Sequence, residues 1–174
     1  MGSYTGRPDQ SAQAPIIGPN TPDEASLPDA DVAPKVPRRS WAWVSSFDGI
    51  SKEMAPILQM SAPRHVKDLT SVAFEPGVPM FRSWLKLFGV LPVDYSDLTL
   101  LSLTPGVGFV EQSRMGSMKL WRHERQIIPL ESGCRVTDTL TFEPRLGGRL
   151  VVAFVARFFA HRHEMLRRYL GRGG

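Results

Sequence analysis

Hydrophobic and polar residues alternate along most of residues 97–142, which is the period of strands with one buried face. Four runs show this period, "DLTLLSL", "GFVEQSRM", "KLWRHERQII" and "CRVTDTLTF". Turn signals separate them at Pro105-Gly106, Gly116-Ser117 and Ser132-Gly133. Because short turns join antiparallel neighbours, the pattern predicts an antiparallel meander of these four strands.

After Gly147-Gly148 the pattern changes to the helical period and continues without proline to Gly171, a residue that suits a helix C-cap. At about 100° per residue, one face of this long helix collects Leu150, Val151, Phe154, Phe158, Met165 and Tyr169. His161 falls within that face, as a core histidine or as a polar group in a cavity. Arg157 and Arg162 lie at its edges, where snorkelling side chains are typical.

The stretch before the meander is predicted to contain short elements. Residues 39–47 and 50–58 favour two helices, with Ser40 and Asp48 as caps. Residues 66–76 are a strand candidate. In residues 79–92 the i+4 spacing of Met80, Trp84 and Phe88 and of Arg82 and Lys86 favours a helix over alternation.

The first part of the chain differs in composition. Residues 1–40 hold 7 of the 15 prolines and a single aromatic residue, Tyr4. Such a segment buries too little apolar surface to offset the cost of ordering its backbone. We therefore expect a disordered, proline-rich tail over residues 1–37 and one domain over residues 38–171.

Composition and charge narrow the classes of protein. No apolar run resembles a signal peptide or a membrane span, and Cys134 is the only cysteine, so we expect a cytoplasmic protein without membrane insertion. The net charge is −1 for residues 1–40, −1 for residues 41–144 and +6 for residues 145–174. Because aromatic residues do not alternate with the basic ones, nucleic acid is not an expected partner.

The last two predicted strands carry an unusual set of inward side chains. With Ser132-Gly133 as a two-residue turn, Ile127 faces Asp138, Arg125 faces Leu140 and His123 faces Phe142. The face that carries Trp121, Ile127 and Phe142 then also carries His123, Arg125 and Asp138. Inward charges are costly unless they are well bonded or meet water in a cavity. The hairpin therefore indicates a partly hollow interior.

These segments resemble a known superfamily. The order of helix pair, meander and long last helix, with "FVEQS", "WRHERQIIP", the "VTD" strand and "FFAHRHEMLRRYLG", is similar to the START and polyketide-cyclase-like proteins (SRPBCC, Bet v 1-like) over roughly residues 38–170. The resemblance implies an α+β helix-grip fold, in which a curved antiparallel sheet wraps around the long helix and encloses an apolar cavity. Such folds normally open with a strand, for which residues 26–32 are the candidate.

The superfamily has no shared catalytic residues to transfer, so chemistry rests on this chain. No Gly-X-Ser-X-Gly elbow occurs, "PGVGF" is not a dinucleotide loop, and His161 and His163 cannot both face one metal ion on a helix. We expect no metal and no cofactor. General acid-base chemistry by His123, with Asp138 or Glu111, remains open beside a structural polar cluster. Glu111 points outward or inward according to the length of the turn at Gly116-Ser117.

The resulting expectation is a monomer or homodimer that binds a small hydrophobic or amphiphilic molecule, such as a lipid, polyketide or aromatic compound. Cavity walls are assigned to Trp84, Phe88, Trp121, Phe142, Phe154 and Phe158, and orienting polar groups to His123, Arg125, Asp138 and His161. One alternative is a polyketide cyclase or dehydratase with His123 as the acid-base group. Another is a basic interaction module that uses the outer face of the long helix and residues 167–174 to bind an acidic partner or RNA.

Overall fold

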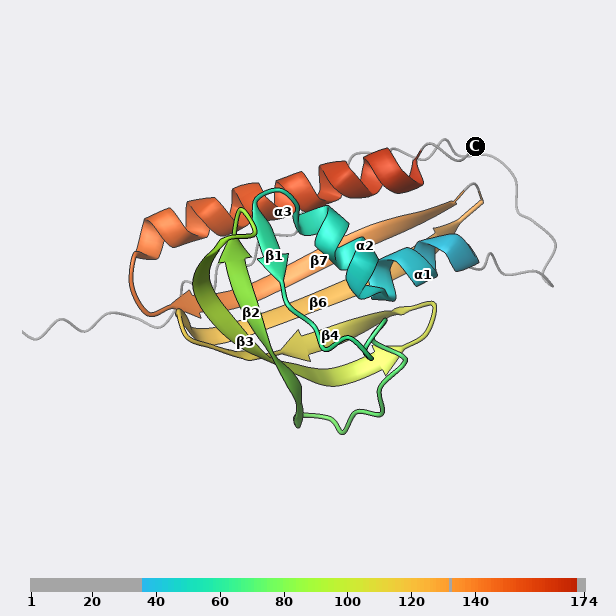
Figure 1. The fold of residues 1–174 in the computed structure, drawn as a ribbon. Coiled ribbons are helices and arrows are strands. Elements are labelled where there is room, and N and C mark those ends of the chain that lie inside the picture. Colours follow the sequence, from blue (N-terminus) through green and yellow to red (C-terminus); the bar gives the residue numbers. More distant parts are fainter. Residues whose placement is uncertain (1–35, 132, 172–174) are drawn as a thin grey trace, which may run out of the picture.

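The structure, a computed structural model, describes residues 36–131 and 133–171, which form an α+β fold (Figure 1). Two short helices, α1 (Arg38–Ser45) and α2 (Phe47–Met54), come before the sheet, and the long helix α3 (Gly148–Leu170) follows it. The described strands are β1 (Leu58–Met60), β2 (Pro79–Leu87), β3 (Leu91–Thr104), β4 (Gly108–Gln112), β5 (Arg114–Met115), β6 (Met118–Leu130) and β7 (Gly133–Pro144).

All strand pairs in this sheet are antiparallel, in the order β1-β2-β3-β4-β6-β7, with β5 paired to β3. Register shifts interrupt the pairing of β2 with β3, of β3 with β4 and of β6 with β7. Such irregularities bend strands and increase twist. The sheet accordingly curls, α3 lies along its open side, and α1 and α2 sit beside the second half of α3 (Figure 1). The predicted meander and long last helix are confirmed.

Buried side chains from the helices and the sheet form the core. One cluster joins Met54 of α2, Phe158 and Phe159 of α3, and Leu140 and Phe142 of β7. A second lies under the bend of the sheet and contains Phe47, Leu69, Leu98, Leu100 and Phe109. These contacts hold α2 and α3 against the sheet, and members of both clusters also border an internal cavity.

The predicted helix over residues 79–92 is wrong, because this segment forms β2 and its hairpin with β3. Ser83 points inward and is fully buried, whereas Arg82 and Trp84 point outward. The outward pair contacts β3: Arg82 Nε donates to Asp97 Oδ1 at 2.7 Å, and the Trp84 ring lies 6.1 Å from that of Tyr95. Of the residues at i+4 spacing that suggested a helix, Arg82, Trp84 and Lys86 pair with Asp97, Tyr95 and Pro92 of β3.

Smaller differences concern the first half of the domain. The expected strand over residues 66–76 makes only the isolated bridge between Ser46 and Asp68. The helix expected to reach residue 58 ends at Met54. Ser46 caps α2 by accepting from the Gly49 amide at 3.0 Å, so the cap lies before Asp48, and Ser40 lies inside α1.

The buried face of α3 differs from the predicted one. Leu150 is 81% exposed and Phe154 and Tyr169 are also exposed, while the buried residues of α3 are Val155, Phe158, Phe159, Arg162, His163 and Leu166. The apolar pattern was misleading because Arg162 and His163 face the interior, where they meet carboxylates. A purely hydrophobic count places both side chains outside.

The expected tail over residues 1–37 and the candidate strand over residues 26–32 lie wholly or almost wholly outside the described residues. Within the described part of the chain, no helix has both the length and the apolar character needed to cross a membrane.

Candidate functional site

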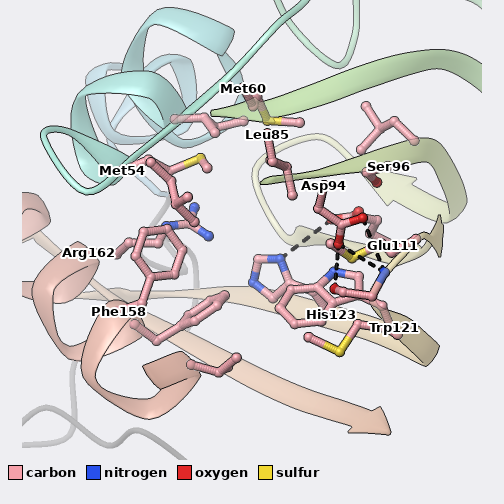
Figure 2. A pocket seen from close by; sticks show the side chains of 18 of the residues that line it. Met54, Met60, Leu85, Asp94, Ser96, Glu111, Trp121, His123, Phe158 and Arg162 are labelled. Atoms are coloured by element: carbon pink, nitrogen blue, oxygen red, sulfur yellow. Dashed lines mark hydrogen bonds and ion pairs between the residues drawn. The ribbon is translucent and has the colours of Figure 1, made fainter. Parts of the chain in front are cut away.

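A cavity of about 400 Å³ lies between the concave face of the sheet and helices α2 and α3 (Figure 2). Most of its wall is apolar. Met54 comes from α2, Met60 from β1, Leu85 from β2, Leu98 from β3 and Phe158 from α3. This volume and composition are typical of sites for small apolar or amphiphilic molecules.

A few polar side chains also line the cavity. Asp94, Ser96, Glu111 and His123 lie on the wall formed by the sheet, and Arg162 reaches in from α3 (Figure 2). Within the described residues, Ser96 Oγ and Arg162 Nε are buried without a hydrogen-bond partner. The Arg162 guanidinium also lies 4.9 Å from the Phe159 ring centroid, which partly stabilises its charge. Both unpartnered atoms could donate to a bound molecule, because an unsatisfied buried polar group is costly.

A buried ionic cluster lies directly behind this wall, with Arg125 at its centre. The Arg125 guanidinium binds Asp138 through Nε at 2.7 Å and Nη2 at 2.9 Å. It binds Glu53 of α2 through Nη1 at 3.1 Å and Nη2 at 3.0 Å. Arg125, Asp138 and Glu53 are each 0% exposed. Two bidentate pairs share one guanidinium, which is the geometry that arginine supplies and lysine does not.

Helix α3 completes the cluster. Arg162 Nη2 donates to Glu53 Oε2 at 2.9 Å, and His163 Nε2 lies 3.0 Å from Asp138 Oδ2 without the orientation of a hydrogen bond. Two arginines thus balance the carboxylates of Glu53 and Asp138. This balance is what permits so many charges to be buried together.

The charges in the cluster fix the ionisation of its central pair. Burial alone raises the pKa of Asp138, but the charge of Arg125, followed by the interactions with His123, holds the pKa well below its ordinary value. Burial likewise acts to lower the pKa of Arg125, and the carboxylates of Asp138 and Glu53 outweigh burial and raise it. Asp138 is therefore an anion and Arg125 a cation throughout the ordinary pH range.

His123 connects the cluster to the cavity. Its Nε2 lies 2.8 Å from Asp138 Oδ1, and its Nδ1 lies 3.8 Å from Glu111 Oε2. Asp138 Oδ1 accepts a hydrogen bond from Nε2, and in the neutral tautomer that carries its proton there, Nδ1 is an acceptor. Nδ1 and the Glu111 carboxylate then form two acceptors that a hydroxyl or a water could bridge.

The strand register settles two open points. Glu111 pairs with His123 across β4 and β6, so Glu111 points inward, and its second oxygen accepts from Ser113 Oγ at 2.6 Å. Arg125 pairs directly with Asp138, two residues from the predicted register, because β6 and β7 pair as far as Leu130 and Gly133. A shift of two residues keeps every side chain on its face. The predicted inward set was therefore correct although the predicted partners were wrong.

The residues assigned to the cavity from the sequence fall into different places. Trp121, His123, Phe154 and Phe158 line it. Arg125 and Asp138 lie in the ionic cluster behind its wall, and Phe142 is buried in the core, in ring contact with Trp121 at 5.9 Å.

The other three assigned residues lie away from the cavity. Trp84 is half exposed on the outer face of β2, and Phe88 is 66% exposed at the tip of the β2–β3 hairpin. His161 Nε2 lies 2.6 Å from the Ala55 carbonyl oxygen, beside a separate surface groove that includes Arg157. The rotated face of α3 and the strand conformation of residues 79–87 explain these placements.

Sequence reasoning missed Glu53, Ser96, Arg162 and His163. Glu53 lies on the apolar face of α2 with Ile50 and Met54, which was a usable signal, because an unpaired carboxylate is rarely buried. Ser96 carried no such signal. Its role depends only on the curvature that brings β3 to the cavity.

The chain was compared with curated proteins, with solved structures and with protein families. No curated protein matches its sequence. The fold is similar to the crystal structure of protein CV1439 from Chromobacterium violaceum, with a TM-score of 0.57 and 13% identity over 80% of this chain and 92% of that one. That similarity concerns the fold alone, and it is compatible with a helix-grip arrangement. Over residues 32–170 the sequence matches the Domain of unknown function (DUF8410), and the chain therefore belongs to that family.

Proposed function

We propose that this protein binds one small amphiphilic molecule in the cavity between the sheet and α3. The observation that carries the proposal is the cavity of about 400 Å³, which is mainly apolar and contains two buried donors without a protein partner, Ser96 Oγ and Arg162 Nε. The apolar body of such a ligand would pack against the methionine and leucine side chains. Its oxygen atoms would accept hydrogen bonds from the two buried donors. Membership in the START and polyketide-cyclase-like superfamily is part of the proposal, and the curled sheet with its long helix supports it.

Filling the cavity should weaken ligand binding without unfolding the protein. Leu85→Trp replaces a leucine side chain on the β2 wall by a large ring that would occupy part of the cavity (Figure 2). We expect the affinity for an anilinonaphthalenesulfonate probe to fall at least about tenfold, which is about 1.4 kcal/mol of binding free energy. Probe fluorescence measures the affinity, and circular dichroism checks that the fold is retained.

Ile128→Trp is the matched control, because Ile128 lies exposed on the outer face of β6. Ser96→Val provides a second arm. It removes an unpartnered hydroxyl, so stability should be unchanged or higher, while native mass spectrometry should show less of any molecule that copurifies. A folded Leu85→Trp protein that binds the probe as tightly as the wild type would refute the proposal.

A second candidate function is general acid-base catalysis on the bound molecule. The observation that favours it is the orientation of His123 by the Asp138 anion, with Nδ1 directed toward Glu111 at the cavity wall. A base held in this way contributes about 10² to 10⁴ in rate. His123→Asn should then keep the copurifying molecule bound and stop its conversion, as followed by mass spectrometry. Conversion at the wild-type rate would exclude His123 as the base.

A further inference from the structure

Exposed apolar side chains gather in two segments that meet at one end of the fold. Phe88 is 66% exposed and Val90 81% exposed at the β2–β3 tip, and Leu146 and Leu150 are 84% and 81% exposed where β7 leads into α3. We call residues 86–93 and 145–157 together the cavity rim. Exposed apolar side chains that gather on one part of a protein surface can mark an interaction site.

The topology brings both segments to the mouth of the cavity. In an antiparallel meander, the β2–β3 turn and the end of β7 lie at the same end of the sheet, and the turns before β4 and β7 lie at the other. Leu87 and Val93 of the hairpin and Val151 and Phe154 of α3 all line the cavity. Figure 1 shows the hairpin approaching the first half of α3. The rim therefore surrounds an entrance.

The hairpin tip contains a strained residue. Phe88 has φ of 50° and is followed by Gly89 with φ of 75°. Bulky side chains avoid this left-handed region, where glycine or asparagine is usual in a hairpin turn. Strained residues of this kind cluster at functional sites. Here it holds an aromatic ring out in solvent beside the entrance.

The charges on the rim have one sign. It contains Lys86, Arg145, Arg149 and Arg157 and no aspartate or glutamate. All four are exposed, and none makes an ion pair with another described residue. Several exposed cations elsewhere on the described surface are paired, such as Lys52 with Asp48 and Lys119 with Glu143. The rim thus combines unpaired positive charge with exposed apolar side chains.

We propose that the rim docks on an anionic lipid bilayer. Apolar side chains can enter the headgroup region while the cations bind acidic headgroups, which is the combination that peripheral membrane contact requires. A second copy of this chain fits less well, because a two-fold contact would bring like charges together. A docked rim would open the cavity toward the bilayer. That last point rests on the proposed ligand-binding function, whereas the docking itself does not.

Vesicle co-sedimentation with the full chain tests the docking. We expect binding to vesicles of equal parts phosphatidylglycerol and phosphatidylcholine, weaker binding as salt is raised, and little binding to phosphatidylcholine alone. The double variant F88S/L150S should bind the anionic vesicles at least about tenfold more weakly than the wild type. R149Q/R157Q should show a loss of about tenfold that high salt reduces.

Two controls match these changes away from the rim. Val107→Ser alters an exposed apolar residue in the β3–β4 turn, at the other end of the sheet, and Arg64→Gln alters an exposed arginine between β1 and β2. Both should bind vesicles as the wild type does. Absence of binding to anionic vesicles at low salt would overturn the proposal, as would equal losses in the controls. A wild-type dimer that F88S/L150S dissociates would assign the rim to self-association instead.

The cavity variant separates this inference from the proposed function. Leu85→Trp should lose the fluorescent probe but keep vesicle binding, because Leu85 lies inside the cavity and outside the rim. If Leu85→Trp still binds the probe while the rim binds vesicles, the cavity proposal fails and the docking stands. If the wild type binds the probe and Leu85→Trp does not, but neither protein binds vesicles, the docking fails and the cavity proposal stands.

Discussion

Arg125→Met is expected to lower the free energy of unfolding by about 3 to 5 kcal/mol. The change removes the cation that holds Glu53 and Asp138 together and leaves both carboxylates fully buried beside each other. Methionine fills a similar volume, so the cost arises mainly from the uncompensated charge. Urea denaturation followed by circular dichroism measures the difference.

Arg122→Met is the control, because Arg122 lies three residues away on the outer face of β6 and pairs with Glu124 at 2.7 Å near solvent. A surface pair of this kind contributes about 1 kcal/mol or less. Arg125→Lys should remain well below wild-type stability, since an ammonium cannot bind both carboxylates bidentately. If Arg125→Met and Arg122→Met cost the same, the cluster does not stabilise the fold.

The same cluster sets a pH dependence whose sign follows from Asp138. Its pKa is lowered in the folded state, so its contribution to stability is fully present above about pH 4 and is lost as the pH falls toward the folded-state value. Asp138→Asn lacks this titration. The stability difference between wild type and Asp138→Asn should therefore shrink as the pH is lowered, and a difference that grows toward acid pH would contradict the assignment.

Phe159→Ala is expected to cost about 3 to 5 kcal/mol, the range for a large ring removed from a packed core. Phe159 is 0% exposed, and its ring lies 5.2 Å from that of His123 and 5.7 Å from that of Phe158. It also supports the Arg162 guanidinium. Because Phe159 lies between the cavity and the ionic cluster, its removal would enlarge the cavity toward the cluster. Thermal or urea unfolding measures the loss.

Phe158→Ala is the matched comparison at the next position of α3. Both rings line the cavity, but Phe158 also borders the surface groove beside His161, so it has fewer protein contacts than the fully buried Phe159. Its replacement should cost at least about 1 kcal/mol less than Phe159→Ala. The reverse order would mean that Phe158 is packed on all sides and that the cavity is filled by the protein itself.

The two ends of the cavity are built in different ways. At its inner end, charges from α2, β6, β7 and α3 meet in one cluster, so Glu53, Arg125, Asp138 and Arg162 fix the helices on the sheet through directional bonds. At its entrance, the hairpin and the first half of α3 present exposed side chains, and the rim cations have no ion-pair partner among the described residues. Opening should therefore be easier at the rim than at the cluster.

The sequence by itself determined the meander, the long last helix and the inward set on β6 and β7. Alternation is a strong signal where one face of a strand is buried, and it places His123, Arg125 and Asp138 inside whichever of two registers is adopted, because a shift of two residues preserves the face. The distribution of charge along the sequence also identified the basic last segment, whose arginines include three of the four cations of the rim.

Only the tertiary structure decided which side chains meet. Residues 79–87 became a strand because β3 supplies partners for Arg82 and Trp84, contacts that no local pattern contains. The buried face of α3 includes Arg162 and His163 because carboxylates from α2 and β7 stabilise these two polar side chains in the interior. Charge pairing between elements far apart in sequence is invisible to periodicity, since it depends on distance in space and on burial. The hairpin between β2 and β3 likewise moved Phe88 from the expected cavity wall to the exposed rim.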